Sequence, residues 1–234
     1  MQTEQKVILS ADELNKDELF SLLKKVGSLV NCIKIHNLFD LHGPSIVSDL
    51  KNAGAKRVWV DFKLHDIPNT VKLRAKALSE SGCDIITVHA SGGIEMMLAA
   101  KQAFGSGKVY AVTALTSLSD EMVKEIYNSS GAEELVNRLA LLVRESGVDG
   151  LVCSPKEISI LRSNRQLTGL ELVVPGIRSA GVETNDQRRF ATPENAIKAG
   201  ANFLVIGRQI TKAANPVEAL KLLEKEILNA LGHV

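Results

Sequence analysis

The sequence has few aromatic residues, no excess of charge and no long apolar run. Phe, Trp and Tyr together make up only 4% of the 234 residues, so any core must be built mainly from aliphatic side chains. Lys and Arg number 28 and Asp and Glu 27, which leaves a formal net charge of +1. Domains that bind nucleic acid usually carry a clustered excess of Lys and Arg. The balanced charge therefore argues against a nucleic-acid partner.

Cysteine is also scarce. Cys32, Cys83 and Cys153 lie far apart, without the spacing of a metal site or of a disulfide framework. No apolar run approaches the ~20 residues that a transmembrane helix needs. The first residues lack the basic segment and apolar stretch of a secretory signal. We therefore expect reduced thiols, no membrane association and a cytoplasmic location.

Short apolar runs alternate with longer amphipathic stretches along the whole chain. The runs are rich in β-branched residues and are bounded by Gly, Asp or Pro, which is typical of buried parallel strands. They occupy residues 7–9, 32–35, 57–63, 84–90, 108–115, 150–154, 170–176 and 202–207. Between them, Asn15 with Glu18 and Ser154 with Glu157 have the spacing of a helix capping box.

Eight strands alternating with about eight helices, in a chain of ~230–250 residues, are typical of a (β/α)8 barrel. We predict an α/β fold in which residues 1–234 form a single-domain TIM barrel. The alternative is an open doubly wound sheet, which usually has about six strands and a glycine-rich first turn. Residues 10–15, SADELN, contain no glycine.

Charged side chains gather where the third predicted strand ends. Because side chains alternate along a strand, Asp61 and Lys63 share the inward face at the mouth of the predicted barrel. Asp66 follows on the next loop, and Lys34 lies near the end of the neighbouring strand. Barrels of this kind carry their functional groups at the C-terminal ends of the strands. We interpret these charges as a candidate catalytic array.

Two other interpretations of the array stay open. The charges could form a structural ion-pair network, since buried charges need partners, although charges that converge on the functional face favour a functional site. Asp61 and Asp66 could instead bind a metal ion through their hard oxygen ligands. The interleaved lysines argue against a metal, because they would neutralise the carboxylates and repel a cation.

Glycine and arginine follow the seventh and eighth predicted strands. Pro175-Gly176-Ile177-Arg178 ends the seventh strand, and Ile206-Gly207-Arg208 ends the eighth. In many barrels the loops after these strands hold a phosphate through backbone N–H groups, and glycine allows close approach. Arg208 can add a bidentate contact. Alone, each residue is more often a turn glycine or a surface arginine, but their joint placement predicts a phosphate site.

These residues resemble the signature of the orotidine 5'-phosphate decarboxylase family. Residues 61–70, DFKLHDIPNT, are similar to the family pattern D-x-K-x-x-D-I-P-N-T, and the resemblance extends over nearly the whole chain. It includes Asp12, Lys34 and residues 112–118, 175–178, 186–189 and 206–208. The D-x-K-x-x-D core alone is shared with a wider superfamily. The added I-P-N-T, the P-G-I-R at 175–178 and Lys34 make the match specific.

The resemblance implies a TIM-barrel enzyme that decarboxylates orotidine 5'-phosphate to UMP, the last step of de novo pyrimidine nucleotide synthesis, without a cofactor or metal. Lys63 would be the general acid that protonates C6 of the pyrimidine after CO2 leaves. Asp61 would lie against the departing carboxylate. Lys34 and Asp12 would bond to the ribose and to the charged array.

The same resemblance implies the remaining contacts. Thr116, with Ser117, would bind the pyrimidine. The phosphate would be held by Arg208 and Gln187, with Arg178 as a helper and Gly207 allowing close approach. The resemblance also implies a homodimer, in which Asp66 and Thr70 reach into the partner's site and touch the ribose.

The chain departs from the usual family pattern in two places. It reads Leu-Ser-Ala-Asp at 9–12, where members often have Leu-Ala-Leu-Asp, and Ile-His-Asn at 35–37, where Val-Gly-Leu is more usual. Ser10 leaves Asp12 in place, and His36 puts a bulky side chain near the mouth. Neither change touches a predicted catalytic position.

Three other functions remain alternatives. Mg2+-dependent decarboxylases or aldolases that act on sugar phosphates share the D-x-K-x-x-D core, but they carry a metal-ligating Glu at the position of Lys34. A non-catalytic nucleotide-binding barrel would bind UMP without turnover. A phosphosugar isomerase or epimerase would need a pair of acid/base carboxylates without a lysine between them.

Overall fold

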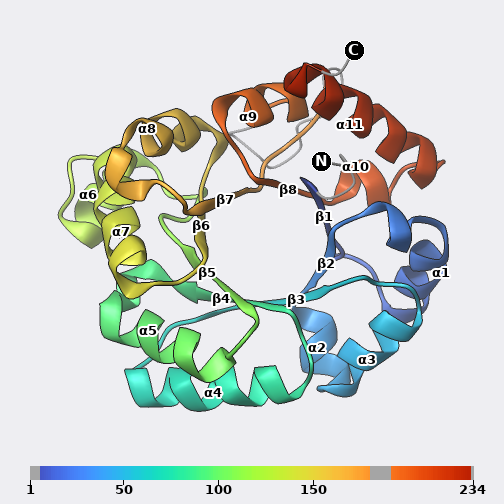
Figure 1. Cartoon of the computed structure of the whole chain (residues 1–234), viewed down its shortest axis with the longest axis horizontal. Coiled ribbons are helices and arrows are strands. Elements are labelled where there is room, and N and C mark those ends of the chain that lie inside the picture. Colours follow the sequence, from blue (N-terminus) through green and yellow to red (C-terminus); the bar gives the residue numbers. More distant parts are fainter. Residues whose placement is uncertain (1–5, 180–190, 233–234) are drawn as a thin grey trace.

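Eight parallel strands form a closed barrel at the centre of the computed structural model, which describes residues 6–179 and 191–232 (Figure 1). Each strand pairs with the next in sequence, and β8 closes the ring against β1. The strands are β1 (Val7–Ser10), β2 (Cys32–Ile35), β3 (Val58–Leu64), β4 (Ile85–His89), β5 (Lys108–Val112), β6 (Gly150–Val152), β7 (Glu171–Val174) and β8 (Phe203–Ile206). The predicted (β/α)8 barrel is confirmed, and all eight predicted runs contain a strand.

The helices surround the barrel as an outer layer (Figure 1). They are α1 (Lys16–Val26), α2 (Asn37–His42), α3 (Ser45–Asn52), α4 (Pro68–Glu80), α5 (Gly93–Phe104), α6 (Asp120–Tyr127), α7 (Ala132–Ser146), α8 (Ile158–Ser163), α9 (Pro193–Ala199), α10 (Arg208–Thr211) and α11 (Pro216–Leu231). Short 3-10 helices are η2 (Gly27–Leu29), η3 (Ala90–Gly92), η4 (Pro155–Glu157) and η5 (Arg165–Leu167). Within the described ranges, no helix is long and apolar enough to cross a membrane.

The helices outnumber the eight expected because several connections are split. Gly43, at φ 69°, ends α2 and is followed by Pro44, so a new helix begins at Ser45. Asn128 ends α6 in the left-handed conformation, at φ 49°. Glycine and asparagine are the residues that adopt this conformation at helix ends most readily. The connections after β2 and β5 therefore each contain two α-helices, and β8 is also followed by two, α10 and α11.

The predicted helix starts are confirmed. The Asn15 side chain accepts a hydrogen bond from the Glu18 N–H at 3.0 Å, and Glu18 accepts one from the Asn15 N–H at 2.9 Å. Ser154 and Glu157 form the same reciprocal pair, which begins η4 ahead of α8. These caps satisfy N–H groups that would otherwise lack partners at the start of a helix.

The core has two parts, because side chains alternate along each strand. Outward residues such as Val58 and Val60 pack against the helices. The barrel interior is filled by a separate cluster formed by Ile8, Cys32, Trp59, Ile85, Tyr110, Val173 and Val205. The Trp59 and Tyr110 rings meet edge to face, with centroids 5.8 Å apart. Two of the chain's few aromatic residues therefore fill the space that short aliphatic side chains leave.

A polar cluster lies at the N-terminal end of the barrel. The Glu171 carboxylate accepts hydrogen bonds from Lys108 Nζ at 2.5 Å and from the Tyr110 hydroxyl at 2.6 Å. Burial and this carboxylate raise the pKa of Tyr110, so its hydroxyl stays a donor. These contacts join β5 and β7 at the N-terminal end of the barrel, whereas functional groups of such barrels lie at the opposite end.

We predict that Gly150→Ala destabilises the barrel. A Cβ at this position would lie 2.3 Å from the backbone oxygen of Glu171 on β7, and backbone cannot move aside as a side-chain tip can. We expect a loss of about 3 kcal/mol, at the upper end for overpacking, measured as a lower urea midpoint.

Gly131→Ala is the matched control. Its added Cβ would meet the side-chain oxygen of Asp120 at 3.2 Å, and the glycine has an extended φ of 169°. We expect a cost of about 1 kcal/mol or less there. Equal midpoints for the two variants would contradict the packing argument at β6.

Candidate active site

A cavity of about 290 Å³ opens at the C-terminal ends of the strands. Eight of the eleven predicted site residues line it, and they come from β1, β2, β3, β5, β7 and β8 or from the loops that follow them. These residues are Asp12, Lys34, Asp61, Lys63, Thr116, Arg178, Gly207 and Arg208. The topology thus brings together side chains that are far apart in sequence, as expected for the functional face of such a barrel.

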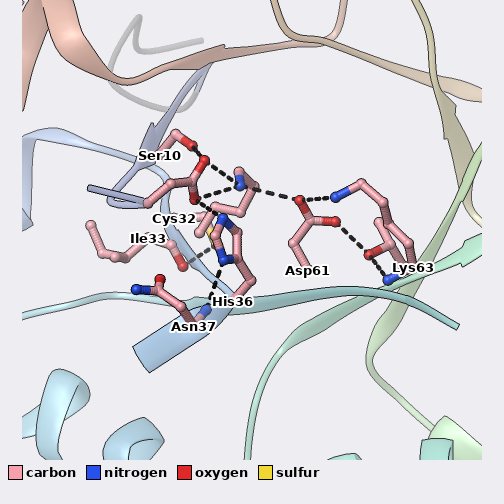
Figure 2. Close-up of polar contacts among 10 residues, drawn as sticks. Ser10, Cys32, Ile33, His36, Asn37, Asp61 and Lys63 are labelled. Carbon is pink, nitrogen blue, oxygen red and sulfur yellow. Dashed lines mark hydrogen bonds and ion pairs between the residues drawn. The ribbon is translucent and has the colours of Figure 1, made fainter. Parts of the chain in front are cut away.

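Lysine and aspartate alternate across one side of this cavity (Figure 2). Lys34 Nζ lies 2.7 Å from Asp12 Oδ1 and 3.1 Å from Asp61 Oδ2. Lys63 Nζ donates to the same Asp61 oxygen at 2.8 Å. The order Asp12, Lys34, Asp61, Lys63 forms one continuous chain of ion pairs, which we call the charged array.

The array compensates for the burial of its central members. Burial alone would raise the pKa of Asp61, but the nearby Lys34 and Lys63 ammonium groups outweigh it and lower that pKa to about 2. Burial would also lower the pKa of Lys34, yet Asp61 and Asp12 outweigh it and raise that pKa. Both groups are therefore charged at neutral pH, although their side chains are only 8% and 7% exposed.

Thr87 on β4 completes the array and was missed by sequence reasoning. Its fully buried hydroxyl donates to Asp61 Oδ1 at 2.6 Å and accepts from the Lys63 backbone N–H at 3.1 Å. Lys63 has φ 49°, an unusual conformation for a residue other than glycine. Thr87 and His89 are the two polar residues of the otherwise apolar strand IITVH. A polar residue in the middle of a buried strand was the sequence signal that could have identified Thr87.

Asp12 has further partners beside Lys34. The Ser10 hydroxyl donates to Asp12 Oδ2 at 2.6 Å, and His36 Nε2 lies 3.3 Å from Asp12 Oδ1 (Figure 2). The two departures from the family pattern thus both contact one carboxylate of the array. The sequence indicated the substitutions but not that they meet at Asp12.

Two arginines that follow β7 and β8 also line the cavity. Arg178 is buried after β7, and both burial and the neighbouring Arg208 lower its pKa. Arg208 Nε is 3.7 Å from the carboxylate of Glu13, which also binds Lys212 Nζ at 2.6 Å. Glu13 lines the cavity and was not predicted. This part of the cavity is rich in cationic donors, which suits an anionic group.

Gly207 is closely packed against the end of β1. A Cβ there would lie 3.3 Å from the backbone oxygen of Ser10 and 3.4 Å from its Cβ. Gly207 immediately precedes α10, so the first N–H groups of this short helix follow it. Ser10 and Gly207 thus bring the ends of β1 and β8 together at the cavity wall.

Asp66 and Thr70 do not line the cavity of their own chain. Asp66 is exposed and Thr70 half-buried, at the start of α4, and Asp66 accepts a hydrogen bond from the Ile67 N–H at 2.6 Å. Gln187 lies outside the described residues. Thr116 does line the cavity, in an exposed position after β5, whereas Ser117 is not among the described residues that line it.

The fold and this cavity define a (β/α)8-barrel enzyme with a charged site at the C-terminal ends of its strands. A model of the orotidine 5'-phosphate decarboxylase / HUMPS family matches residues 5–223. The chain therefore belongs to this family.

Known relatives agree with the assignment. The chain is 41% identical to an orotidine 5'-phosphate decarboxylase of Syntrophomonas wolfei, with 95% of this chain and 98% of that one covered. It is 44% identical to the enzyme of the same name from Streptococcus pneumoniae serotype 19F, with 88% and 85% covered. The crystal structure of orotidine 5'-phosphate decarboxylase from Lactobacillus acidophilus superposes with a TM-score of 0.82 at 35% identity, covering 95% of this chain and 98% of that one.

We predict that Thr87→Val weakens the site and Thr87→Ser preserves it. Valine has a similar shape but cannot donate to Asp61, so a buried carboxylate oxygen loses a partner at a cost of about 1–3 kcal/mol. Chemical denaturation should report that loss for valine only. If valine and serine unfold at the same midpoint, the hydroxyl does not support the array.

Proposed function

We propose that this chain decarboxylates orotidine 5'-phosphate to UMP, the last step of de novo pyrimidine nucleotide synthesis. The observation that carries the proposal is the charged array, in which Lys63 Nζ lies 2.8 Å from a buried Asp61 inside the cavity. The names of the curated relatives support the same reaction. We further propose that residues 1–234 act as one barrel domain in the cytoplasm.

The difficult step is the departure of CO2. The bond between C6 and the carboxylate breaks, its electron pair stays on C6, and the pyrimidine ring cannot delocalise the charge. An ammonium group placed beside C6 stabilises this developing charge electrostatically. Lys63 then gives a proton to C6, forms the new C–H bond and recovers its own proton from solvent.

Asp61 has two roles in this proposal. Its hydrogen bond holds the Lys63 ammonium in place, and its ionised oxygens lie where the substrate carboxylate would be bound. Because the pKa of Asp61 is about 2, it is an anion at neutral pH and repels that carboxylate. Repulsion of this kind favours loss of CO2 by destabilising the bound substrate.

The rest of the substrate is held by groups around the cavity. Arg208, Arg178 and Gln187 bind the phosphate, and Gly207 lets the backbone approach it. Thr116 contacts the pyrimidine. Asp12 and Lys34 contact the ribose. Binding energy from the distant phosphate can then be used to orient the pyrimidine at the charged array.

We propose that the reaction needs no metal or other cofactor. The matched family also includes a second group of members, designated HUMPS. The second candidate function is therefore the reaction of the Mg2+-dependent relatives that act on sugar phosphates and share the D-x-K-x-x-D core. Lys34 weighs against it, because its ammonium is within 3.1 Å of both Asp12 and Asp61 and repels a cation there. In the described part of the chain, no three His, Cys, Asp or Glu side chains form a group suited to a metal ion.

We propose a homodimer in which Asp66 and Thr70 act in the partner's site. Both residues begin α4 away from the cavity of their own chain. Two apolar side chains beside them, Ile67 and Leu73, are 65% and 60% exposed. Exposed apolar side chains next to Asp66 and Thr70 in sequence support a protein interface at this helix. A second copy of the chain would cover them and receive Asp66.

We predict that Lys63→Ala abolishes turnover while an excess of EDTA leaves the unaltered enzyme unaffected. The variant loses both the charge stabilisation and the proton donor, so we expect a fall of at least ~10³-fold in kcat. The measurement is the absorbance change of orotidine 5'-phosphate. Lys76→Ala is the control, because Lys76 is a surface lysine that is 69% exposed.

Other outcomes distinguish the alternatives. Loss of activity in EDTA, restored by Mg2+, would move the function to the metal-dependent relatives. UMP binding without any turnover of orotidine 5'-phosphate would indicate a non-catalytic nucleotide-binding barrel. Full activity of Lys63→Ala would remove the proposed general acid.

We predict that mixing inactive Lys63→Ala and Asp66→Ala chains restores activity. Half of the dimers in an equal mixture contain one chain of each kind, and one site in each is intact, so about one quarter of the activity should return. Lys63→Ala mixed with Asp61→Ala is the control, because these two residues are in contact within one chain. Shared sites are ruled out if both mixtures stay inactive.

A further inference from the structure

The Asp12 carboxylate is much more exposed than Lys34 and Asp61, the two buried members of the charged array, and needs to be held in place. Its side chain is 35% exposed, compared with 7% for Lys34 and 8% for Asp61. An exposed carboxylate on a loop after a strand can rotate freely unless other groups bind it. Lys34 contacts both of its oxygens, at 2.7 and 3.0 Å, but Lys34 is also shared with Asp61.

The position of the proton on His36 follows from its other contact. The Asn37 backbone N–H donates to His36 Nδ1 at 2.7 Å, so Nδ1 carries the lone pair. A neutral imidazole has one donor and one acceptor nitrogen, so the proton is on Nε2. This nitrogen lies 3.3 Å from Asp12 Oδ1, so its N–H is next to the carboxylate. The backbone at the start of α2 thus turns the ring toward the array (Figure 2).

Ser10 holds the second oxygen of the same carboxylate. Its hydroxyl donates to Asp12 Oδ2 at 2.6 Å, from the end of β1. Asp12 Oδ1 therefore faces His36 and Oδ2 faces Ser10, while Lys34 contacts both. With donors on both oxygens, the plane of the carboxylate is fixed, and so is the direction in which Asp12 presents its charge to Lys34.

We propose that Ser10 and His36 are positioning residues for the reaction, acting through Asp12 on Lys34 and the ribose site. This inference rests on the proposed decarboxylation. His36 does not line the cavity, so it acts without touching the substrate. Neither residue moves a proton in the reaction. Each keeps the Asp12–Lys34 pair in the geometry that the substrate requires.

Two substitutions of His36 separate positioning from helix capping. His36→Gln can place an amide N–H near the site of Nε2 and keep the donor to Asp12. His36→Asn is too short for that, but asparagine is a favoured helix N-cap residue and preserves the start of α2. We expect His36→Asn and Ser10→Ala each to lose about tenfold in kcat/KM, since a small displacement of a catalytic group is costly. His36→Gln should stay near the original value.

Coupling to Asp12 is the decisive test. In an Asp12→Asn background, His36→Asn and Ser10→Ala should have little further effect, because their shared target is already changed. Losses of the same size in both backgrounds would overturn the proposal, as would full activity of His36→Asn and Ser10→Ala. If only one of the two variants loses activity, the other residue is not a positioning residue.

A measurement without substrate keeps this proposal separate from the proposed function. Nitrogen-15 NMR of the histidine rings distinguishes Nε2–H from Nδ1–H, and the His36→Asn spectrum assigns the signal. We expect the Nε2–H form in the original protein and a shifted Nε2 signal in Asp12→Asn. An Nδ1–H form, or a signal unchanged in Asp12→Asn, would overturn the His36 contact even if decarboxylation is confirmed. Failure of decarboxylation alone would leave this signature intact.

Discussion

The buried carboxylate of Asp61 is the constraint on which the upper end of the barrel depends. Removing a charge from water costs several kcal/mol unless partners replace the lost hydration. Asp61 has three such partners: Lys34 and Lys63 at Oδ2, and the Thr87 hydroxyl at Oδ1. They come from β2, β3 and β4, and Lys34 continues the contacts to Asp12 after β1. Four neighbouring strand ends are therefore held in register by electrostatics, above an interior that is held together by apolar packing.

The backbone at the end of β3 is adapted to this array. The pairing of β3 with β4 shifts register between Val60 and Leu64, and Lys63 within this stretch has φ 49°. Strained conformations of this kind persist where the surrounding contacts determine them, and they cluster at functional sites. Here the Thr87 hydroxyl accepts a hydrogen bond from the Lys63 backbone N–H, and the Lys63 ammonium donates one to Asp61. Side chain and backbone of one residue are thus fixed by two members of the same network.

Most of the fold could be predicted from sequence, because the strands and helices depend on local patterns. Capping pairs such as Asn15 with Glu18 can be recognised from their spacing in the sequence, and the structure confirms this pair. The split of the connections after β2 and β5 was missed, because a left-handed residue such as Asn128 leaves only a weak signal. In the site, the charged residues were recognisable, but the contacts of Ser10, His36 and Thr87 were not. These contacts form between residues on different strand ends, so a local sequence pattern does not predict them.

Trp59 gives the molecule an internal optical reporter. It is the only tryptophan in the chain and is 1% exposed. It lines the cavity, and its ring packs against Tyr110 in the barrel interior. The emission of an indole depends on the polarity and motion of its surroundings. The tryptophan fluorescence of this protein therefore comes from one known point in the barrel, two residues before Asp61 on β3. Occupancy of the cavity and opening of the barrel can both be followed there without attaching a dye.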